Sequence, residues 1–351
     1  AAAMADSGNV VISGKIAADV TFVNGTGQTG TADNNTHQVN NNNSIVTLAM
    51  NEDLGNGNKA FASLTYGLPM TNGGALAGQN QIAGLEGKSW GKVFVGAFDN
   101  PLKVMGRGTD LFADQSTGDA RTLTNIGAVE ARANDVIAYI TPSFNGFTGV
   151  LAHSNNPLGT VAADGATIST FTNANTSVTG TTLAAGQTTA MNIVKLAYAN
   201  GPLSLAAGSH RVDMGATDEK AWRLTGGYTA GAVKVVGSYQ KVSDQLGTLG
   251  ADFKVWGLGA AYMTGATTVK GQYYKLSNDT AGTTNANANM LALGVDYAMS
   301  KRTTLQLAYS KVNNDSGENY GGNTGVAGAD NLAVANGSDP TRLSLGMKHT
   351  F

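Results

Sequence analysis

The chain of 351 residues contains no cysteine and only six prolines. Without cysteine it can form neither disulfides nor thiolate metal sites. No apolar run approaches the roughly 18 residues that a membrane-spanning helix needs, which excludes transmembrane helices. Charged residues make up only 13% of the chain, a low share for the surface of a soluble protein. The net charge of −2 gives no indication of a nucleic-acid partner.

Glycine, in contrast, is abundant, with 47 residues. Many glycines and few prolines are typical of curved strands joined by tight turns. Period-2 alternation and turn residues predict sixteen strands and a single domain covering residues 1–351. The predicted strands are 9–23, 44–54, 59–70, 81–88, 91–99, 134–141, 147–155, 191–200, 203–212, 220–229, 232–242, 253–263, 266–277, 288–298, 302–312 and 341–351.

The predicted connections alternate in length. Short ones are followed by long polar ones, which include residues 24–43, 100–133, 156–190 and 313–340. This alternation is typical of outer-membrane barrels, and an even strand number lets the last strand pair with the first. The asparagine tract at 32–43 and the segment 156–190 are predicted to be solvated loops. The alternative, disordered linkers between soluble domains, leaves the tyrosine pattern described next unexplained.

Tyrosines recur at similar offsets around three short turns, on the same face as the aliphatic residues of each strand. A face that is apolar in its middle and aromatic at both ends matches a strand crossing a bilayer. The opposite face carries polar residues such as Arg223, Gln240 and Gln272, which are expected to face water. The pattern therefore predicts an all-β, transmembrane antiparallel barrel with a water-filled lumen. The expected interface aromatics are Tyr198, Tyr228, Tyr239, Tyr262, Tyr273, Tyr297, Tyr309 and Phe351.

Candidate lumen charges come from two strands and one long loop. Alternation places Lys15 inward on the first strand and Lys59 inward near the short-turn rim. The segment 100–133 adds acidic and basic residues, so that the predicted constriction set is Lys15, Lys59, Arg107, Asp110, Asp114, Asp119, Glu130 and Arg132. In one interpretation, Asp110, Asp114 and Asp119 face Lys15 and Arg132 across a narrow pore, and the resulting field filters solutes. In the other, several loop charges pair among themselves and hold the loop to the wall.

Several segments resemble the general bacterial porins of the betaproteobacterial and neisserial type. Residues 297–304 (YAMSKRTT) are similar to the family's YxLSKRT turn, and 343–351 (LSLGMKHTF) to its terminal strand, which ends in (R/K)HxF. Residues 85–102 and 134–149 are similar to the segments before and after the family's third loop. The resemblance covers the whole chain in order. It implies a sixteen-stranded homotrimer in the outer membrane of a Gram-negative bacterium, with the third loop folded into each pore and Phe351 recognised by the assembly machinery.

The chain departs from this family at two positions. Gly96-Ala97 stands where many members have Gly-Arg, and Ala138 stands where many have a basic residue. The usual basic ladder is thinned, so the family's anion preference is not carried over. Outward small residues permit close packing between subunits; they are Gly14, Ala18, Ala60, Ala62 and Ala83.

These features predict a passive diffusion channel for small hydrophilic solutes and ions. The alternative is a substrate-selective channel for a sugar or an organic anion, which a stack of lumen aromatics would favour. A secreted all-β adhesin, a third possibility, would be soluble without detergent and would lack paired aromatic girdles.

No enzyme activity, cofactor or metal site is predicted. The four histidines show no HxH or HExxH spacing. Gly87-Lys88-Ser89 lacks the first glycine of a phosphate-binding loop, and His210 and Asp213 are interpreted as solvated rim residues. The opening Ala1-Ala2-Ala3 suggests that a signal peptide has been removed. Outer-membrane lipid and lipopolysaccharide are the expected partners of the barrel. Acidic residues of the outer loops either share divalent cations with lipopolysaccharide or only solubilise the loop tips; they are Asp33, Asp244, Asp279, Asp315, Glu318, Asp330 and Asp339.

Overall fold

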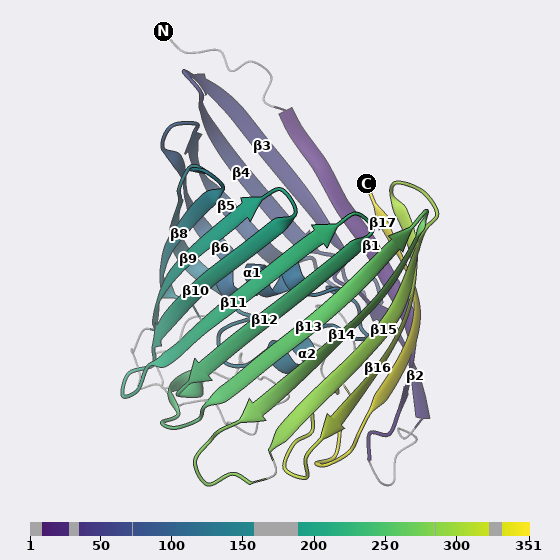
Figure 1. The fold of residues 1–351 in the computed structure, drawn as a ribbon. Helices are drawn as coiled ribbons and strands as arrows, with labels where there is room; N and C mark the ends of the chain where they lie inside the picture. The colour runs from purple at the N-terminus through teal and green to yellow at the C-terminus, as the bar shows by residue number, and fades with distance from the viewer. Residues whose placement is uncertain (1–8, 28–34, 72, 158–188, 285, 323–331) are drawn as a thin grey trace.

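With one exception described below, each strand pairs antiparallel with the next, and the last strand pairs with the first, so the sheet closes into a barrel in this computed structural model (Figure 1). The structure describes residues 9–27, 35–71, 73–157, 189–284, 286–322 and 332–351. The strands are β1 (Asn9–Asn24), β2 (Asn35–Asn41), β3 (Ile45–Gly55), β4 (Asn58–Gly67), β5 (Ala77–Gly87), β6 (Gly91–Asp99), β7 (Arg132–Ile140), β8 (Phe147–Asn156), β9 (Ala190–Asn200), β10 (Leu203–Asp213), β11 (Glu219–Ala230), β12 (Val233–Ser243), β13 (Phe253–Thr264), β14 (Thr267–Asn278), β15 (Asn287–Ala298), β16 (Thr303–Asn314) and β17 (Thr341–Thr350). Two helices, α1 (Pro101–Thr109) and α2 (Arg121–Thr124), and a short 3-10 turn, η3 (Gln245–Gly247), complete the described elements. No helix in these ranges is long and apolar enough to cross a membrane.

In the part of the chain that the structure describes, the sheet has seventeen strands, but β2 and β3 share one position in the wall. β2 pairs with residues 18–24 of β1, and β3 pairs with residues 9–15 of the same strand. Counting them together leaves the sixteen wall positions that were predicted. The prediction of a loop across 32–43 was wrong for 35–41, while 32–34 lie outside the described residues. Polar side chains stabilise this strand from the lumen, because Asn40 and Asn42 both donate hydrogen bonds to Asp19 of β1.

The connections alternate in length as predicted. The start of β1, the C-terminus and the short turns lie at one end of the barrel, and the strand ends that the long connections join lie at the other (Figure 1). Two strand bounds differ from the prediction by more than two residues. β4 ends at Gly67 instead of 70, since Pro69 has no N–H to donate. β5 begins at Ala77 instead of 81, because Ala77 still pairs with Gly67. Most of the predicted loop 156–190 falls in 158–188, outside the described residues.

The outer face is an apolar band between two rows of aromatic side chains. Its middle exposes aliphatic residues such as Leu258 and Leu345. Four of the predicted interface tyrosines lie toward the short turns and three toward the long loops; the first group is Tyr198, Tyr228, Tyr262 and Tyr297, and the second is Tyr239, Tyr273 and Tyr309. Tryptophans strengthen the long-loop row, where the Trp222 and Tyr239 rings stack with centroids 5.0 Å apart.

The main apolar core lies inside the barrel, where the segment 100–131 packs against the wall. Leu102, Leu123 and Ile126 of this segment are fully buried. They share one cluster with inward residues of β9 to β16, including Met191, Val255 and Leu276. The segment therefore occupies part of the lumen and is held there by burial of apolar surface as well as by polar contacts.

The barrel seam depends on close contact between Gly14 and the chain end. Gly14 exchanges both backbone hydrogen bonds with Phe351, each 3.1 Å long. A Cβ on Gly14 would collide with the carbonyl oxygen of Ile45 and would lie 2.8 Å from the Phe351 ring. Gly14 is thus required for the barrel to close between β1 and β17. A substitution of Gly14 would disturb this seam as well as any packing between subunits.

We expect Gly14→Val to weaken the seam, because the backbone of β3 cannot yield to the new side chain without losing ladder hydrogen bonds. The expected result is a folded band on unheated gels that disappears at a temperature lower by about 5 °C or more. Ser13→Ala, one residue away on β1, is the matched control and should behave as the unmodified protein. Equal heat-modifiability of all three proteins would contradict this role of Gly14.

Candidate functional site: the inward loop and its charged rim

The segment 100–131, between β6 and β7, enters the lumen through α1 (Figure 1). Asn100 caps the helix, its side chain accepting from the Leu102 N–H, and Pro101 occupies the first turn, where its missing N–H costs nothing. The buried face of α1 presents Leu102 and Met105 to the wall. A Cβ on Gly106 would collide with the guanidinium of Arg223, so glycine here lets the helix approach that strand.

Arg223 on β11 forms the first anchor of the loop. Its guanidinium donates to the Leu102 carbonyl and to Glu130 Oε1, both at 2.6 Å, and also to Gln240. Gln240 in turn donates to the Thr124 carbonyl at 3.0 Å. Arg223 is 1% exposed. The expectation that Arg223, Gln240 and Gln272 face water was therefore wrong, because the loop covers this part of the wall.

Glu219, at the start of β11, forms the second anchor. Its carboxylate accepts from the Ala128 N–H at 2.8 Å and from His210 Nε2 at 3.0 Å. The other ring nitrogen of His210 accepts from Asn100 Nδ2 at 2.9 Å, which places the single ring proton on Nε2. His210 is buried, so its interpretation as a solvated rim residue was wrong. It links the N-cap of α1 to the wall.

Two further anchors come from β14 and β1. Gln272 donates to Asp110 and to the Gly118 carbonyl, both at 2.8 Å, and accepts from the Leu111 N–H. On β1, Asp19 accepts from Ser116 Oγ at 2.6 Å. Strands far apart in sequence thus hold the loop at several points, which favours a loop of fixed position.

The rim of the loop carries a compact ionic cluster. Asp114 accepts from Lys15 of β1 at 2.7 Å, from Arg107 at 3.1 Å and from Arg121 at 2.9 Å. Both arginines also contact Asp119, at 2.9 and 3.0 Å. The side chains of Lys15, Arg107 and Asp114 are 17%, 18% and 24% exposed, so these three can meet water and solutes.

A second ionic group lies where β6 and β7 meet the loop. Asp99 accepts from Lys103 of α1 at 2.8 Å and from Arg132 at 3.1 Å. Asn80 of β5 donates to the same carboxylate and accepts from Arg132. Arg132, whose side chain is 25% exposed, forms its ion pair with Asp99. Its placement across the pore from the loop aspartates stays a prediction, because a pair with Asp99 neither shows nor excludes it.

Three predicted constriction residues are too buried to line the pore. The side chains of Asp110 and Asp119 are fully buried, and Glu130 is covered by its contact with Arg223. For Asp110 and Asp119 the contacts support the second interpretation, in which loop charges pair within the loop. Lys59 is exposed on β4 near the short turns, opposite Asp53 and away from these clusters.

The three loop carboxyls differ in acidity. Burial and the charge of Asp119 raise the pKa of Asp110 to about 6. Burial alone would also raise the other two, but Arg107 and Arg121 outweigh it and hold the pKa values of Asp114 and Asp119 below the usual range, with Lys15 assisting at Asp114. Three carboxylates and three cations (Lys15, Arg107, Arg121) balance at neutral pH. The cluster gains one positive charge when Asp110 is protonated.

The outer-loop carboxylates engage local partners. Asp279 pairs with Lys254 at 2.7 Å, and Asp315 accepts from Asn287. Asp244 and Asp339 accept from backbone N–H groups, and burial raises the pKa of Glu318. Asp33 and Asp330 lie outside the described residues.

The chain matches known porins in sequence and in structure. A family model described as Gram-negative porin covers residues 1–317. An outer membrane porin protein of Bordetella pertussis is 27% identical over 209 residues, which cover 55% of this chain and half of that protein's length. Among solved structures, an anion-selective porin from Comamonas acidovorans is similar with a TM-score of 0.76, at 22% identity over 98% of this chain and all of the other.

A second solved structure, OmpT of Vibrio cholerae, is similar with a TM-score of 0.68, at 13% identity over 99% of this chain and 98% of the other. At 22% and 13% identity, these two structures show only that the fold is shared, and this fold is a closed barrel with sixteen wall positions. The family model, by contrast, spans most of the sequence. The chain therefore belongs to the Gram-negative porin family and is a protein of the bacterial outer membrane.

Proposed function

We propose that this porin is a passive diffusion channel for small hydrophilic solutes and ions. The observation that carries the proposal is the charged, partly exposed rim of a loop anchored inside the barrel. A fixed constriction needs no energy input and no moving part, and side chains of both signs on its rim can exchange contacts with a passing solute. Planar-bilayer conductance tests it: steady steps are expected, and a folded barrel without conductance would overturn it.

The rim further supports a weak preference for anions. Its partly exposed cations are Lys15, Lys103, Arg107 and Arg132, against the carboxylates Asp99 and Asp114. Four positive and two negative groups leave a surplus of two positive charges, which buried Arg121, Asp110 and Asp119 reduce to one. A surplus this small raises local anion concentration without excluding cations. The Comamonas relative, described as anion-selective, is consistent with this sign.

Asp114→Asn is expected to increase the anion preference, because it removes one of the two exposed carboxylates from the rim. Lys15, Arg107 and Arg121 keep this carboxyl ionised through neutral pH, so the variant changes a charge that is present there. The reversal potential under a salt gradient should move toward the anion value, with the largest shift at low ionic strength. Asp53→Asn removes a carboxylate on β3, next to the short turn, and is the matched control. Equal shifts in both variants would argue against a selective rim.

A homotrimer is the assembly that we propose, and OmpT of Vibrio cholerae has a structure described as a trimer form. The outer face of β4 and β5 is suited to close packing, since Ala62 and Ala83 are cross-strand neighbours there. Ala83 also lies opposite exposed Val95. Ala18 and Ala60 extend this surface of small residues.

We also propose that outer-loop carboxylates share divalent cations with lipopolysaccharide. Support comes from Asp279 and Asp339, which lie at the long-loop end and are at least partly exposed. Chelation with EDTA is expected to release most of the lipopolysaccharide that copurifies with the barrel, measured by silver-stained gels. Retention unchanged by EDTA would exclude a cation bridge.

A further inference from the structure

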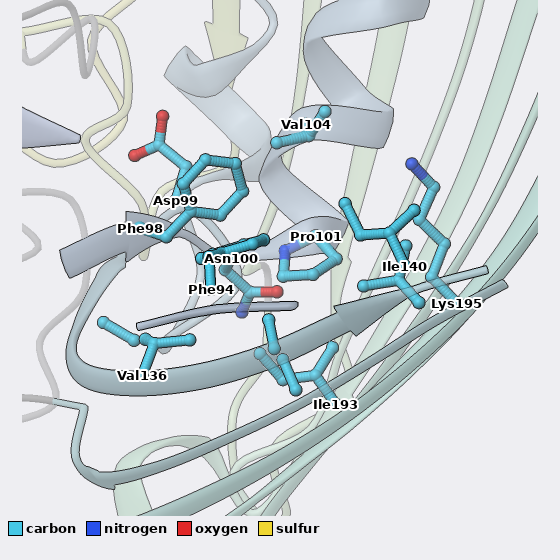
Figure 2. A pocket seen from close by; sticks show the side chains of 14 residues that line it. Phe94, Phe98, Asp99, Asn100, Pro101, Val104, Val136, Ile140, Ile193 and Lys195 are labelled. Atoms are coloured by element: carbon cyan, nitrogen blue, oxygen red, sulfur yellow. The ribbon is translucent and has the colours of Figure 1, made fainter. Parts of the chain in front are cut away.

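A pocket of about 130 Å³ lies inside the barrel, between α1 and the wall strands β6 to β9 (Figure 2). Its walls are almost entirely apolar, although the surrounding lumen is polar. Phe94, Phe98 and Pro101 contribute to it from β6 and the start of α1, and Ile140 and Ile193 from β7 and β9. The pocket touches the second ionic group only through Asp99, and it is not needed to explain ion passage.

Small side chains in the wall create this hollow. Strand pairing places Phe94, Ala138, Ala152 and Ile193 side by side in one row across β6 to β9. The two alanines at the middle of the row leave space that larger side chains would fill. α1 closes the space from the lumen side through Pro101 and Val104.

The size and lining of the pocket suit an aromatic ring. An apolar cavity of about 150 Å³ lined by aliphatic and aromatic residues is large enough for benzene. Phe94 and Phe98 already meet edge to face, with ring centroids 5.1 Å apart, and a third ring can extend such a cluster. Phe94 is almost completely buried, so its ring is held in place.

The charge at the edge of the pocket is positive. The next row of the wall is Ile140, Val150 and Lys195, and Figure 2 shows Lys195 beside Ile140 at one edge, with Asp99 and Phe98 at the other. Among the described residues, no carboxylate lies within 4.0 Å of the Lys195 ammonium. Asp99, the one acidic lining residue, is paired with both Lys103 and Arg132. The edge therefore favours an anion.

We propose that this pocket binds a small aryl carboxylate of about the size of benzoate, with its ring in the apolar hollow and its carboxylate on Lys195. Binding is non-covalent and reversible, as a site on a diffusion route requires. The inference deepens the proposed function by assigning an organic-anion site below the loop. The inference rests on the proposed channel function in one respect: the ligand reaches the pocket through the channel.

Calorimetric titration of the detergent-purified barrel tests the site with three probes: benzoate, benzyl alcohol and acetate. Benzoate is expected to bind saturably, benzyl alcohol at least tenfold more weakly, and acetate not measurably. Lys195→Met should weaken benzoate binding at least tenfold and leave benzyl alcohol binding unchanged, because only the charge-assisted contact is lost. Ala138→Leu should abolish binding of both aryl probes by filling the hollow. Lys234→Met, on β12, is the matched control.

Three results would overturn the site. They are equal binding of benzoate and acetate, benzoate binding that survives both pocket variants, and no saturable benzoate binding at all. Conductance in potassium chloride, measured on the same preparations, separates this inference from the proposed function. Normal conductance without benzoate binding rejects the pocket alone, whereas absent conductance with benzoate binding rejects the channel and keeps the pocket.

Discussion

Replacing Arg223 with methionine is expected to destabilise the protein by about 3–5 kcal/mol, the range measured when one partner of a buried ion pair is removed. The variant leaves the buried Glu130 carboxyl without its ion-pair partner; among the described residues, the remaining donor to it is Thr124 Oγ1 at 3.0 Å. It also removes the donor to the Leu102 carbonyl, which joins α1 to β11. The free energy of unfolding in detergent micelles, followed by tryptophan fluorescence, should fall by that amount.

The loop should also lose its fixed position in this variant. We expect larger and noisier conductance steps, since α1 and the Glu130 segment are released together from the wall. The control is the double variant Arg223→Met with Glu130→Gln, in which no buried charge is left unpaired. It should recover most of the lost free energy, because a buried ion pair contributes little beyond a neutral pair of similar shape. If the double variant is as unstable as Arg223→Met, the unpaired Glu130 is not the cause of the lost free energy of unfolding.

The barrel wall was predictable from the sequence because each wall residue obeys a local rule. Alternation with period 2 places Leu224 outward and Arg223 inward whatever the neighbouring strand does. Turns such as Gly201-Pro202 interrupt that alternation at positions visible in the sequence. The sixteen wall positions, the loop alternation and the outward tyrosines follow from these local features alone, whereas β2, which lacks an apolar alternation, was missed.

The surroundings of inward residues could not be predicted from the sequence in this way, because they depend on what else occupies the lumen. Arg223, Gln240 and Gln272 were expected to meet water, but the segment 100–131 covers them. No local pattern distinguishes a polar residue facing water from one facing a folded loop. A hint lay in their chemistry, because long donor side chains in the middle of a wall can bind loop carbonyls and carboxylates.

The ionic roles of the loop also depend on its conformation. Asp110, Asp114 and Asp119 are equivalent in sequence, yet only Asp114 reaches Lys15 and remains partly exposed. Asp114 has a left-handed backbone, with φ of 62°. Asparagine and aspartate tolerate this region better than most residues, but tolerance alone does not identify which aspartate adopts it.

Asp19→Ala is expected to release β2 and the part of the inward loop around Ser116 from the barrel wall. After Arg223→Met, this is the variant with the largest expected effect. Asp19 accepts from Asn40 at 3.0 Å, Asn42 at 2.5 Å and Ser116 at 2.6 Å. Alanine would remove this shared acceptor, at a cost of about 1–3 kcal/mol for each buried group left unsatisfied. Asn40 Nδ2 and Ser116 Oγ would keep their contacts with Thr21 Oγ1. Asn40, in β2, and Asn42, just after it, are both buried.

Hydrogen exchange distinguishes this local release from general unfolding. The amides of β2 and of Ser116 should exchange at least tenfold faster in Asp19→Ala, while those of the seam between β1 and β17 keep their protection. Thr47→Ala is the matched control, because it removes a lumen hydrogen bond to Thr65 on neighbouring strands without touching β2. Uniform acceleration over all strands would mean that Asp19 supports the whole barrel. Unchanged exchange in β2 would mean that backbone pairing with β1 alone holds this strand, and the asparagine side chains would then have no role in forming it.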